Sequence, residues 1–239
     1  MTSKNAVHAT PGPAKNFRRS RKWIQKLVCD ESELFAFAIH QAVPQVQSTS
    51  IEWRSPTKED GYREYRDGKA LRALDLHHLR GRLTKFWPAR GPVWDALGIG
   101  NAASERFLVE AKAHIAEVVT SPTAAAGSSL RRIRTRLNAV KRALGSRTKS
   151  DWTGAFYQYA NRLAYLNWLH ERGVRAYLVG VYFTNAPDVP RPVSEPEWQG
   201  ALAVLRSYLG LSQQHRLKPY VVDVFIDVAE LKCSRAGIA

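Results

Sequence analysis

Two features that this chain lacks limit the classes to which it can belong. Its 239 residues include only two cysteines, Cys29 and Cys233, which lie far apart and have no CxxC motif or His-rich neighbour. This pattern predicts neither a zinc site nor a disulfide framework, and it fits a reducing cytoplasm. No apolar run approaches the ~18 residues of a membrane-spanning helix, and the segment from Met1 to Lys15 has no apolar core typical of a signal peptide. We therefore expect a cytoplasmic protein without a membrane span.

Acidic residues are also scarce relative to basic ones. The chain has 21 Asp and Glu against 36 Lys and Arg, for a formal net charge of +15. A field of this sign attracts polyanions and accelerates their association. Nucleic acid, with DNA in first place, is the expected partner; an anionic membrane surface and an acidic protein are the alternatives. The sequence leaves the oligomeric state open, a homodimer included.

The composition divides the chain into a short arm and one folded unit. Residues 1–20 are rich in Pro, Ser, Lys, Asn and Arg and show no apolar periodicity, which predicts a flexible basic arm. Such an arm either serves solubility alone or contacts DNA. From residue 21 to residue 239 we expect a single domain, because 44% hydrophobic residues support a substantial core.

Hydrophobic periodicity predicts alternating helices and strands along that domain. A mixed central sheet covered by helices, an α/β sandwich, accommodates this order. Helices are expected at about 30–41 with Asp30 as N-cap, within 60–85 with a break near Gly81, and at 128–144, 151–171 and 194–209; strands are expected at about 51–55, 107–115, 174–183 and 220–228.

The strand expected at 107–115 has one polar and one apolar face. Side chains alternate between the faces of a strand. The polar face carries Glu110, Lys112 and His114, and the apolar face carries Val109, Ala111, Ala113 and Ile115. A lysine beside a glutamate, with Asp95 delivered from the preceding segment, suits the binding of a divalent cation and the activation of a water next to a phosphate.

The same residues resemble a known family. Asp95, fourteen further residues, then Glu110-Ala111-Lys112 on an apolar strand and a helix containing Gln158-Tyr159-Ala160-Asn161-Arg162 are similar to the core of the PD-(D/E)XK, or restriction-endonuclease-like, nuclease superfamily. The resemblance spans roughly residues 90–185. It implies a restriction-endonuclease-like α/β/α sandwich and a nuclease that hydrolyses phosphodiester bonds in DNA with Mg²⁺ or Mn²⁺.

The resemblance also implies a role for each matching residue. Asp95, Glu110 and the backbone carbonyl of Ala111 would bind the metal, Lys112 would orient or activate the attacking water, and Gln158 would reach the site from its helix. The chain departs from the family's pattern at Trp94, where proline is usual before the aspartate. Many members have a further acidic residue, and the candidates for this third acid are Glu33 and Glu52.

Arginines and a lysine on the helix expected at 128–144 predict a nucleic-acid-binding surface. Cations without an acidic partner in the run repel each other, which favours a face directed at an anion.

Arg162, one turn from Gln158, is either a further nucleic-acid contact or a hydrogen-bonding residue at the edge of the core. His114 either contacts a phosphate or supports the site. The alternative function is a non-catalytic nucleic-acid-binding protein on the same scaffold. The proposed binding residues of the helix are Arg131, Arg132, Arg134 and Lys141.

Overall fold

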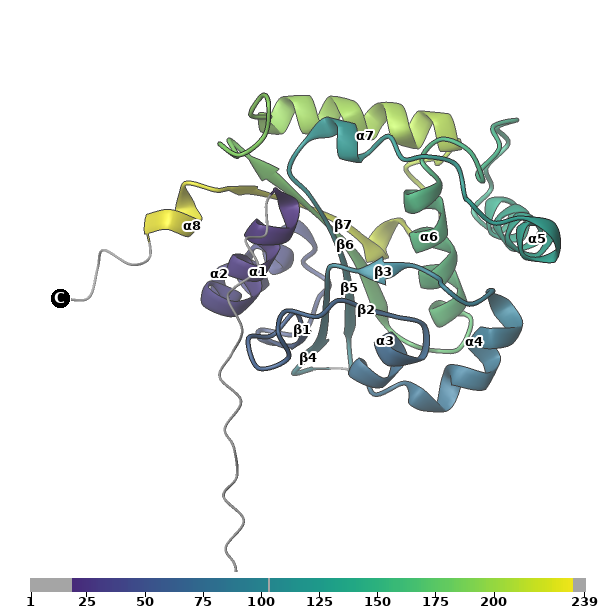
Figure 1. Cartoon of the computed structure of the whole chain (residues 1–239), viewed down its shortest axis with the longest axis horizontal. Coiled ribbons are helices and arrows are strands. Elements are labelled where there is room, and N and C mark those ends of the chain that lie inside the picture. The colour runs from purple at the N-terminus through teal and green to yellow at the C-terminus, as the bar shows by residue number, and fades with distance from the viewer. Residues whose placement is uncertain (1–18, 103, 234–239) are drawn as a thin grey trace, which may run out of the picture.

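A five-stranded mixed sheet forms the centre of the computed structural model, which describes residues 19–102 and 104–233 (Figure 1). Strand β4 is antiparallel to both of its neighbours, whereas β5, β6 and β7 are parallel to one another. The start of β4 therefore lies at the same edge of the sheet as the end of β5. In spatial order the strands are β1 (Ile51–Ser55), β4 (Ala96–Gly100), β5 (Arg106–Lys112), β6 (Ala176–Thr184) and β7 (Val221–Asp227).

Helices cover both faces of this sheet. On one face α1 (Ser20–Asp30) and α2 (Ser32–Ala42) pack against a core that includes Val109 and Val179. On the other face the larger core includes Leu97, Leu108 and Leu178. All nine residues of β6 are buried, as expected for a central strand covered on both sides. The α/β sandwich predicted from the order of elements is thus confirmed. The larger core is covered by α5 (Gly127–Ala143), α6 (Tyr157–His170) and α7 (Glu195–Leu209), together with the shorter helices described next.

A small antiparallel ribbon leads into the start of β4. It pairs β2 (Tyr65–Arg66) with β3 (Val93–Trp94), which ends one residue before Asp95. The ribbon is a separate two-stranded sheet, and its strand β3 leads through Asp95 into β4. The other short elements are α3 (Asp67–Ala73), η1 (His77–Leu79), α4 (Arg80–Phe86), η2 (Ile115–Glu117), η3 (Lys218–Tyr220) and α8 (Glu230–Cys233).

The helix predicted at about 30–41 is present as α2, but its predicted N-cap is wrong and the helix before it was not predicted. Asp30 is the last residue of α1, and α2 begins at Ser32. The three-and-four spacing of Trp23, Ile24, Leu27 and Val28 makes α1 amphipathic, and all four side chains are buried. Because α1 already includes Ser20, the predicted basic arm is at least one residue too long, and its residues 1–18 lie outside the described ranges.

Two further helix boundaries differ from the prediction. Within 60–85 the break falls at Leu74 to Leu76 instead of Gly81, which lies inside α4. The helix expected from Asp151 begins at Tyr157, because the Asp151 carboxylate accepts hydrogen bonds from the amide and hydroxyl of Thr153 and stabilises a turn instead. In the described parts of the chain, none of the helices combines the length and the apolar composition needed to cross a bilayer.

Candidate functional site

Asp95 lies beside the end of β5, close to Glu110. The Asp95 amide donates to the Val109 carbonyl at 3.1 Å, and the Asp95 Oδ2 accepts from the Ala111 amide at 2.7 Å. Val109 is also the partner of Ala96, so Asp95 and Ala96 both lie opposite Val109 and the regular register ends at Ala96. The charges of Asp95 and Glu110 interact, which places the two carboxylates near each other. The tertiary structure therefore brings the two predicted carboxylates together.

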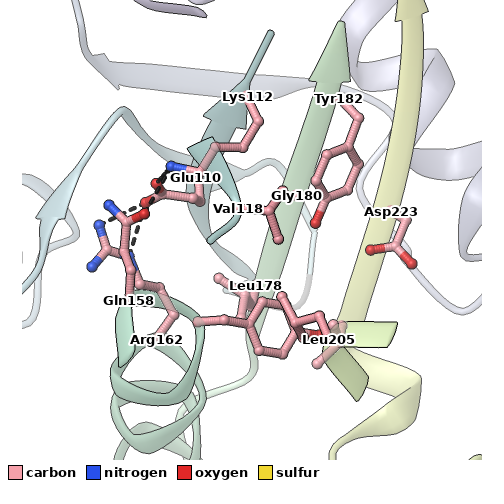
Figure 2. A pocket seen from close by; sticks show the side chains of 12 residues that line it. Glu110, Lys112, Val118, Gln158, Arg162, Leu178, Gly180, Tyr182, Leu205 and Asp223 are labelled. Atoms are coloured by element: carbon pink, nitrogen blue, oxygen red, sulfur yellow. Dashed lines mark hydrogen bonds and ion pairs between the residues drawn. The ribbon is translucent and has the colours of Figure 1, made fainter. Parts of the chain in front are cut away.

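Glu110 is the centre of a network that joins β5 to α6 (Figure 2). Its Oε1 forms an ion pair with the Lys112 ammonium, which also donates to the Gln158 Oε1 at 2.8 Å. Its Oε2 accepts from Nε of Arg162 at 2.8 Å and forms an ion pair with Nη2 of Arg162 at 2.6 Å. Gln158 and Arg162 lie one turn apart on α6, so a single helix face supplies both partners. The predicted glutamate, lysine and glutamine thus contact one another.

Arg162 occupies a different place from the one expected of a DNA-contacting surface residue. Its side chain is only 5% exposed, its Nη2 donates to the Val93 carbonyl at 2.7 Å, and its guanidinium lies over the Trp94 ring at 5.3 Å. It therefore supports Glu110 from the edge of the core, which is the alternative that the sequence left open.

The pKa values of the two carboxylates are shifted in opposite directions. Burial, reinforced by the negative charge of Glu110, raises the pKa of Asp95 from 3.8 to about 7. Burial also disfavours ionised Glu110, but Arg162 and Lys112 more than offset this and hold the pKa of Glu110 below its usual value. Near neutral pH the site thus contains an ionised glutamate beside an aspartate that titrates readily.

The donor chemistry of this pair fits a hard divalent cation. Two carboxylates that face each other in a poorly solvated place repel, as the raised pKa of Asp95 reflects, and a bound cation would relieve that repulsion. Asp95, Glu110 and the Ala111 carbonyl would hold it, as the sequence predicts. Among residues 19–102 and 104–233 no group of three or more His, Cys, Asp or Glu side chains is arranged to hold a metal. The ligand set would therefore depend on backbone oxygen and solvent.

A row of residues extends the site across the sheet. Glu110 pairs with Gly180 on β6, and Gly180 pairs with Asp223 on β7. Together with Tyr182 these residues line a cavity of about 30 Å³, and Figure 2 shows the Tyr182 ring between the Glu110 network and Asp223. Asp223 forms an ion pair with Arg206 of α7, while its buried Oδ1 has no hydrogen-bond partner among the described residues. The cavity is large enough for about one water.

Gly180 is required for the packing of the Tyr182 ring, so Gly180→Ala should destabilise the protein. A Cβ atom at this position would lie 2.5 Å from the Tyr182 hydroxyl and 2.8 Å from its ring, and the buried ring has little room to move. We expect a loss of about 1–3 kcal/mol in the free energy of unfolding, measured by urea denaturation. Gly200→Ala on α7 is the control: a Cβ there meets nothing within 4 Å, and helix propensity predicts a gain of about 0.4–1 kcal/mol. Equal stabilities of the two variants would contradict this account.

Glu64 is an acidic residue of the site that the sequence did not indicate. Pairing of Tyr65 with Trp94 places Glu64 opposite Asp95 when the ribbon register is continued by one residue. Burial raises the pKa of Glu64, Arg21 at 2.8 Å lowers it, and the nearby charge of Glu110 raises it. Glu64 therefore lies close enough to Glu110 for their charges to interact. No local motif marks it, because its position depends on the pairing of two segments that are about 30 residues apart.

The two predicted candidates for a third acid lie elsewhere. Glu52 is on β1 opposite Ile99, its side chain is 65% exposed, and it pairs with Arg54. Glu33 is an exposed residue in the first turn of α2. Neither lines the cavities around Glu110, so the structure brings neither of them to the site. Both were chosen by chain order, whereas the ribbon brings Glu64 to the site.

His114 lies beyond the end of β5 and supports the chain locally. The strand ends at Lys112, and the His114 Nδ1 accepts a hydrogen bond from the Ala116 amide at 3.2 Å. The imidazole thereby caps the short helix η2. The two-residue alternation consequently breaks down at this point, and Ile115 packs against the core on the opposite face from the one predicted.

An open groove of about 840 Å³ leads to the carboxylates. One wall is the segment 87–93 with Arg66, and the other comprises 120–126 and the first turns of α5 and α6. Asp95, Glu64, Gln158 and Arg162 all contribute to its lining. A ligand of some size can therefore approach the site from this side.

The basic residues of α5 point in three directions. Arg131 is exposed on the outside of the helix, Arg132 donates to the Thr84 carbonyl at 3.3 Å, and Arg134 pairs with Asp151 at 3.4 Å. Lys141 donates to the Ser150 carbonyl at 2.9 Å. The predicted single basic face is thus divided between solvent, the end of α4 and the 148–151 segment.

Comparison of this chain with protein-family models, with curated proteins and with solved structures gave no match. Function is therefore inferred from the residues of the site.

Proposed function

We propose that this protein is a divalent-cation-dependent nuclease that hydrolyses phosphodiester bonds in DNA and has a restriction-endonuclease-like fold. One observation carries the proposal: Asp95, Glu110, Lys112 and Gln158 meet at one edge of the sheet, beside a groove open to solvent. Four residues that the sequence singled out for one chemistry come from three separate segments. Their convergence favours a site over a coincidence of spacing.

The topology supports the fold part of the proposal. An antiparallel run of β1, β4 and β5 is followed by α5 and α6 and then by β6, which is parallel to β5. This places the glutamate and lysine on a central strand and the glutamine on the helix that precedes β6, which is the context expected for the motif.

Each side chain of the site has a physical task in the proposed reaction. Lys112 is held between Glu110 and Gln158, so its ammonium is oriented before substrate arrives and can stabilise negative charge that develops on a phosphate. Arg162 keeps Glu110 ionised and in place. A bound Mg²⁺ or Mn²⁺ would supply Lewis-acid polarisation of the phosphate. The groove would exclude part of the solvent and position the DNA backbone.

Cleavage assays on a panel of DNA substrates test this function. The panel should contain single strands, duplexes and branched duplexes, each with Mg²⁺, with Mn²⁺ and with EDTA. We expect cleavage of at least one substrate that depends on the metal. Tight binding without cleavage of any substrate would favour the second candidate function, a non-catalytic nucleic-acid-binding protein. That candidate is favoured by one observation: Lys112 and Arg162 already occupy both oxygens of Glu110.

Both candidates predict that the proposed binding residues of α5, Arg131, Arg134 and Lys141 among them, contribute to DNA affinity. Charge reversal at Arg131, Arg134 and Lys141 should weaken binding, because each phosphate contact that is lost reduces counterion release. The slope of log K against log salt should decrease by about 0.9 for each contact removed. Fluorescence anisotropy over a range of salt concentrations measures both quantities.

Lys26→Glu provides the control for this binding experiment. Lys26 lies on α1, which covers the face of the sheet opposite to α5, and the change of charge is the same as for each reversed residue. An equal loss of affinity per charge in the control would assign the effect to net charge alone.

A further inference from the structure

A second cavity, of about 230 Å³, lies between α4, α5 and α6, and four cations are among the residues that line it. Arg82, Lys85, Arg136 and Arg172 contribute to its walls, and among the described residues that line it Glu171 is the single carboxylate. Glu171 is already engaged: its Oε1 accepts from the Asn167 amide at 2.7 Å, and its Oε2 forms an ion pair with Nη1 of Arg172 at 3.8 Å. The volume is far above the ~10–15 Å³ that one water needs, so a larger anion can enter.

Two of the arginines are held in place by the protein. The Nε and Nη2 of Arg136 donate to the carbonyls of Phe86 and Lys85, each at 3.3 Å, at the end of α4. The Nη1 of Arg172 donates to the Trp168 carbonyl at 2.7 Å, and its guanidinium lies over the Trp168 ring at 4.3 Å. These contacts orient both guanidinium groups. Little side-chain entropy would then be lost on binding an anion.

The cluster has binding capacity that its internal contacts do not use. The Nε of Arg172 is buried and has no hydrogen-bond partner among the described residues. Burial lowers the pKa of Arg172, the nearby charge of Glu171 raises it, and the charges of Arg82 and Arg136 lower it. Arg82 and Lys85 are exposed at the rim. A phosphate in the cavity would accept hydrogen bonds from these groups and relieve their mutual repulsion.

The cavity and the proposed active site lie on the same pair of helices. Ile133 and Gln158 line the groove, whereas Arg136 and Glu171 line the basic cavity. Gln158 and Glu171 are thirteen residues apart on or just beyond α6, which corresponds to about 20 Å along the helix. A DNA duplex advances 3.4 Å per base pair, so this distance corresponds to about six base pairs.

We propose that Arg82, Lys85, Arg136 and Arg172 form a second phosphate-binding site, which holds the backbone of the DNA about six base pairs from the point of cleavage. This inference rests on the DNA-binding part of the proposed function. It adds a specific footprint: short substrates occupy the active site alone, and longer ones also reach the basic cavity.

The test combines the double variant Arg82→Gln/Lys85→Gln with duplexes that extend about three or about ten base pairs beyond the cut on each side. Both residues are exposed, so the variant should fold. We expect KM to rise about tenfold for the long duplex, with kcat unchanged, and to stay the same for the short one. Arg142→Gln, an exposed arginine of α5 that does not line the cavity, is the control and should leave both values unchanged.

Binding measurements separate this inference from the proposed catalytic function. Anisotropy titrations of the Lys112→Ala protein, with and without the double substitution, report on DNA binding without cleavage. A loss of affinity for the long duplex only would support the second site even if the protein cuts no DNA. A double variant that behaves like Arg142→Gln at both lengths would overturn it. Inorganic phosphate or a mononucleotide that binds the wild type tightly and the double variant weakly, without any effect of duplex length, would also overturn it and assign the cavity to a small anion.

Discussion

Lys112→Ala should lower the rate of metal-dependent DNA cleavage by about 10²- to 10⁴-fold while DNA affinity changes little. The Lys112 ammonium is positioned by Glu110 and Gln158 at the edge where Asp95 and Glu110 meet, so its removal affects charge that develops during the reaction. The cations of α5 and the groove remain in place. Single-turnover rates and anisotropy titrations measure the two effects separately, and the loss should appear in kcat.

The controls for Lys112 concern stability and charge. The Lys112 side chain is only 12% exposed, so its removal can affect packing as well as charge. Glu110 keeps its ion pair with Arg162 in the variant. Lys112→Met retains the apolar stem and should unfold at a urea concentration close to that of the wild type. Lys149→Ala removes the charge of an exposed lysine elsewhere and should cleave normally. If the Lys112 variants cut as fast as the wild type, the site has been assigned to the wrong residues.

Asp95→Asn should abolish metal-dependent cleavage and, in the absence of metal, should stabilise the protein at pH 8. The pKa of Asp95 is raised from 3.8 to about 7, so between these pH values the folded protein keeps a proton on Asp95 that the unfolded chain has lost. The contribution of this group to stability is therefore fully present below about pH 4 and is lost as the pH rises through about 7. The asparagine variant does not lose this stability. The difference between its free energy of unfolding and that of the wild type should therefore be small at pH 4 and large at pH 8.

The same carboxylate should make metal binding depend on pH. A cation competes with the proton on Asp95, so Mg²⁺ should raise the Tm of the wild type more at pH 8 than at pH 6 and should have little effect on the Asp95→Asn protein. Glu52→Gln, which removes an exposed carboxylate far from the site, should behave like the wild type in both experiments. An unchanged response to Mg²⁺ in Asp95→Asn would falsify the assignment of Asp95 as a ligand.

The local sequence pattern was sufficient to predict the position of several residues of the site. Alternation along residues 107–112 correctly placed Glu110 and Lys112 on the face opposite Val109 and Ala111, because the pleat of a strand depends only on the strand itself. The same alternation failed at Ile115, where η2 replaces the strand. Helix boundaries failed where a side chain such as Asp151 competes with the helix for backbone hydrogen bonds.

The sequence by itself determined the alternating elements, the polar face of β5 and the excess of positive charge, since each depends on residues that are close along the chain. Only the tertiary structure decided that Glu64, Gly180 and Asp223 join the row of Asp95 and Glu110, because strand register is set by contacts between distant segments. It also divided the cations of α5 between solvent and the carbonyls of α4, since the docking of one helix end against another depends on their packing. The residues of a segment set its own secondary structure and charge, whereas the residues that it contacts depend on how distant segments pack.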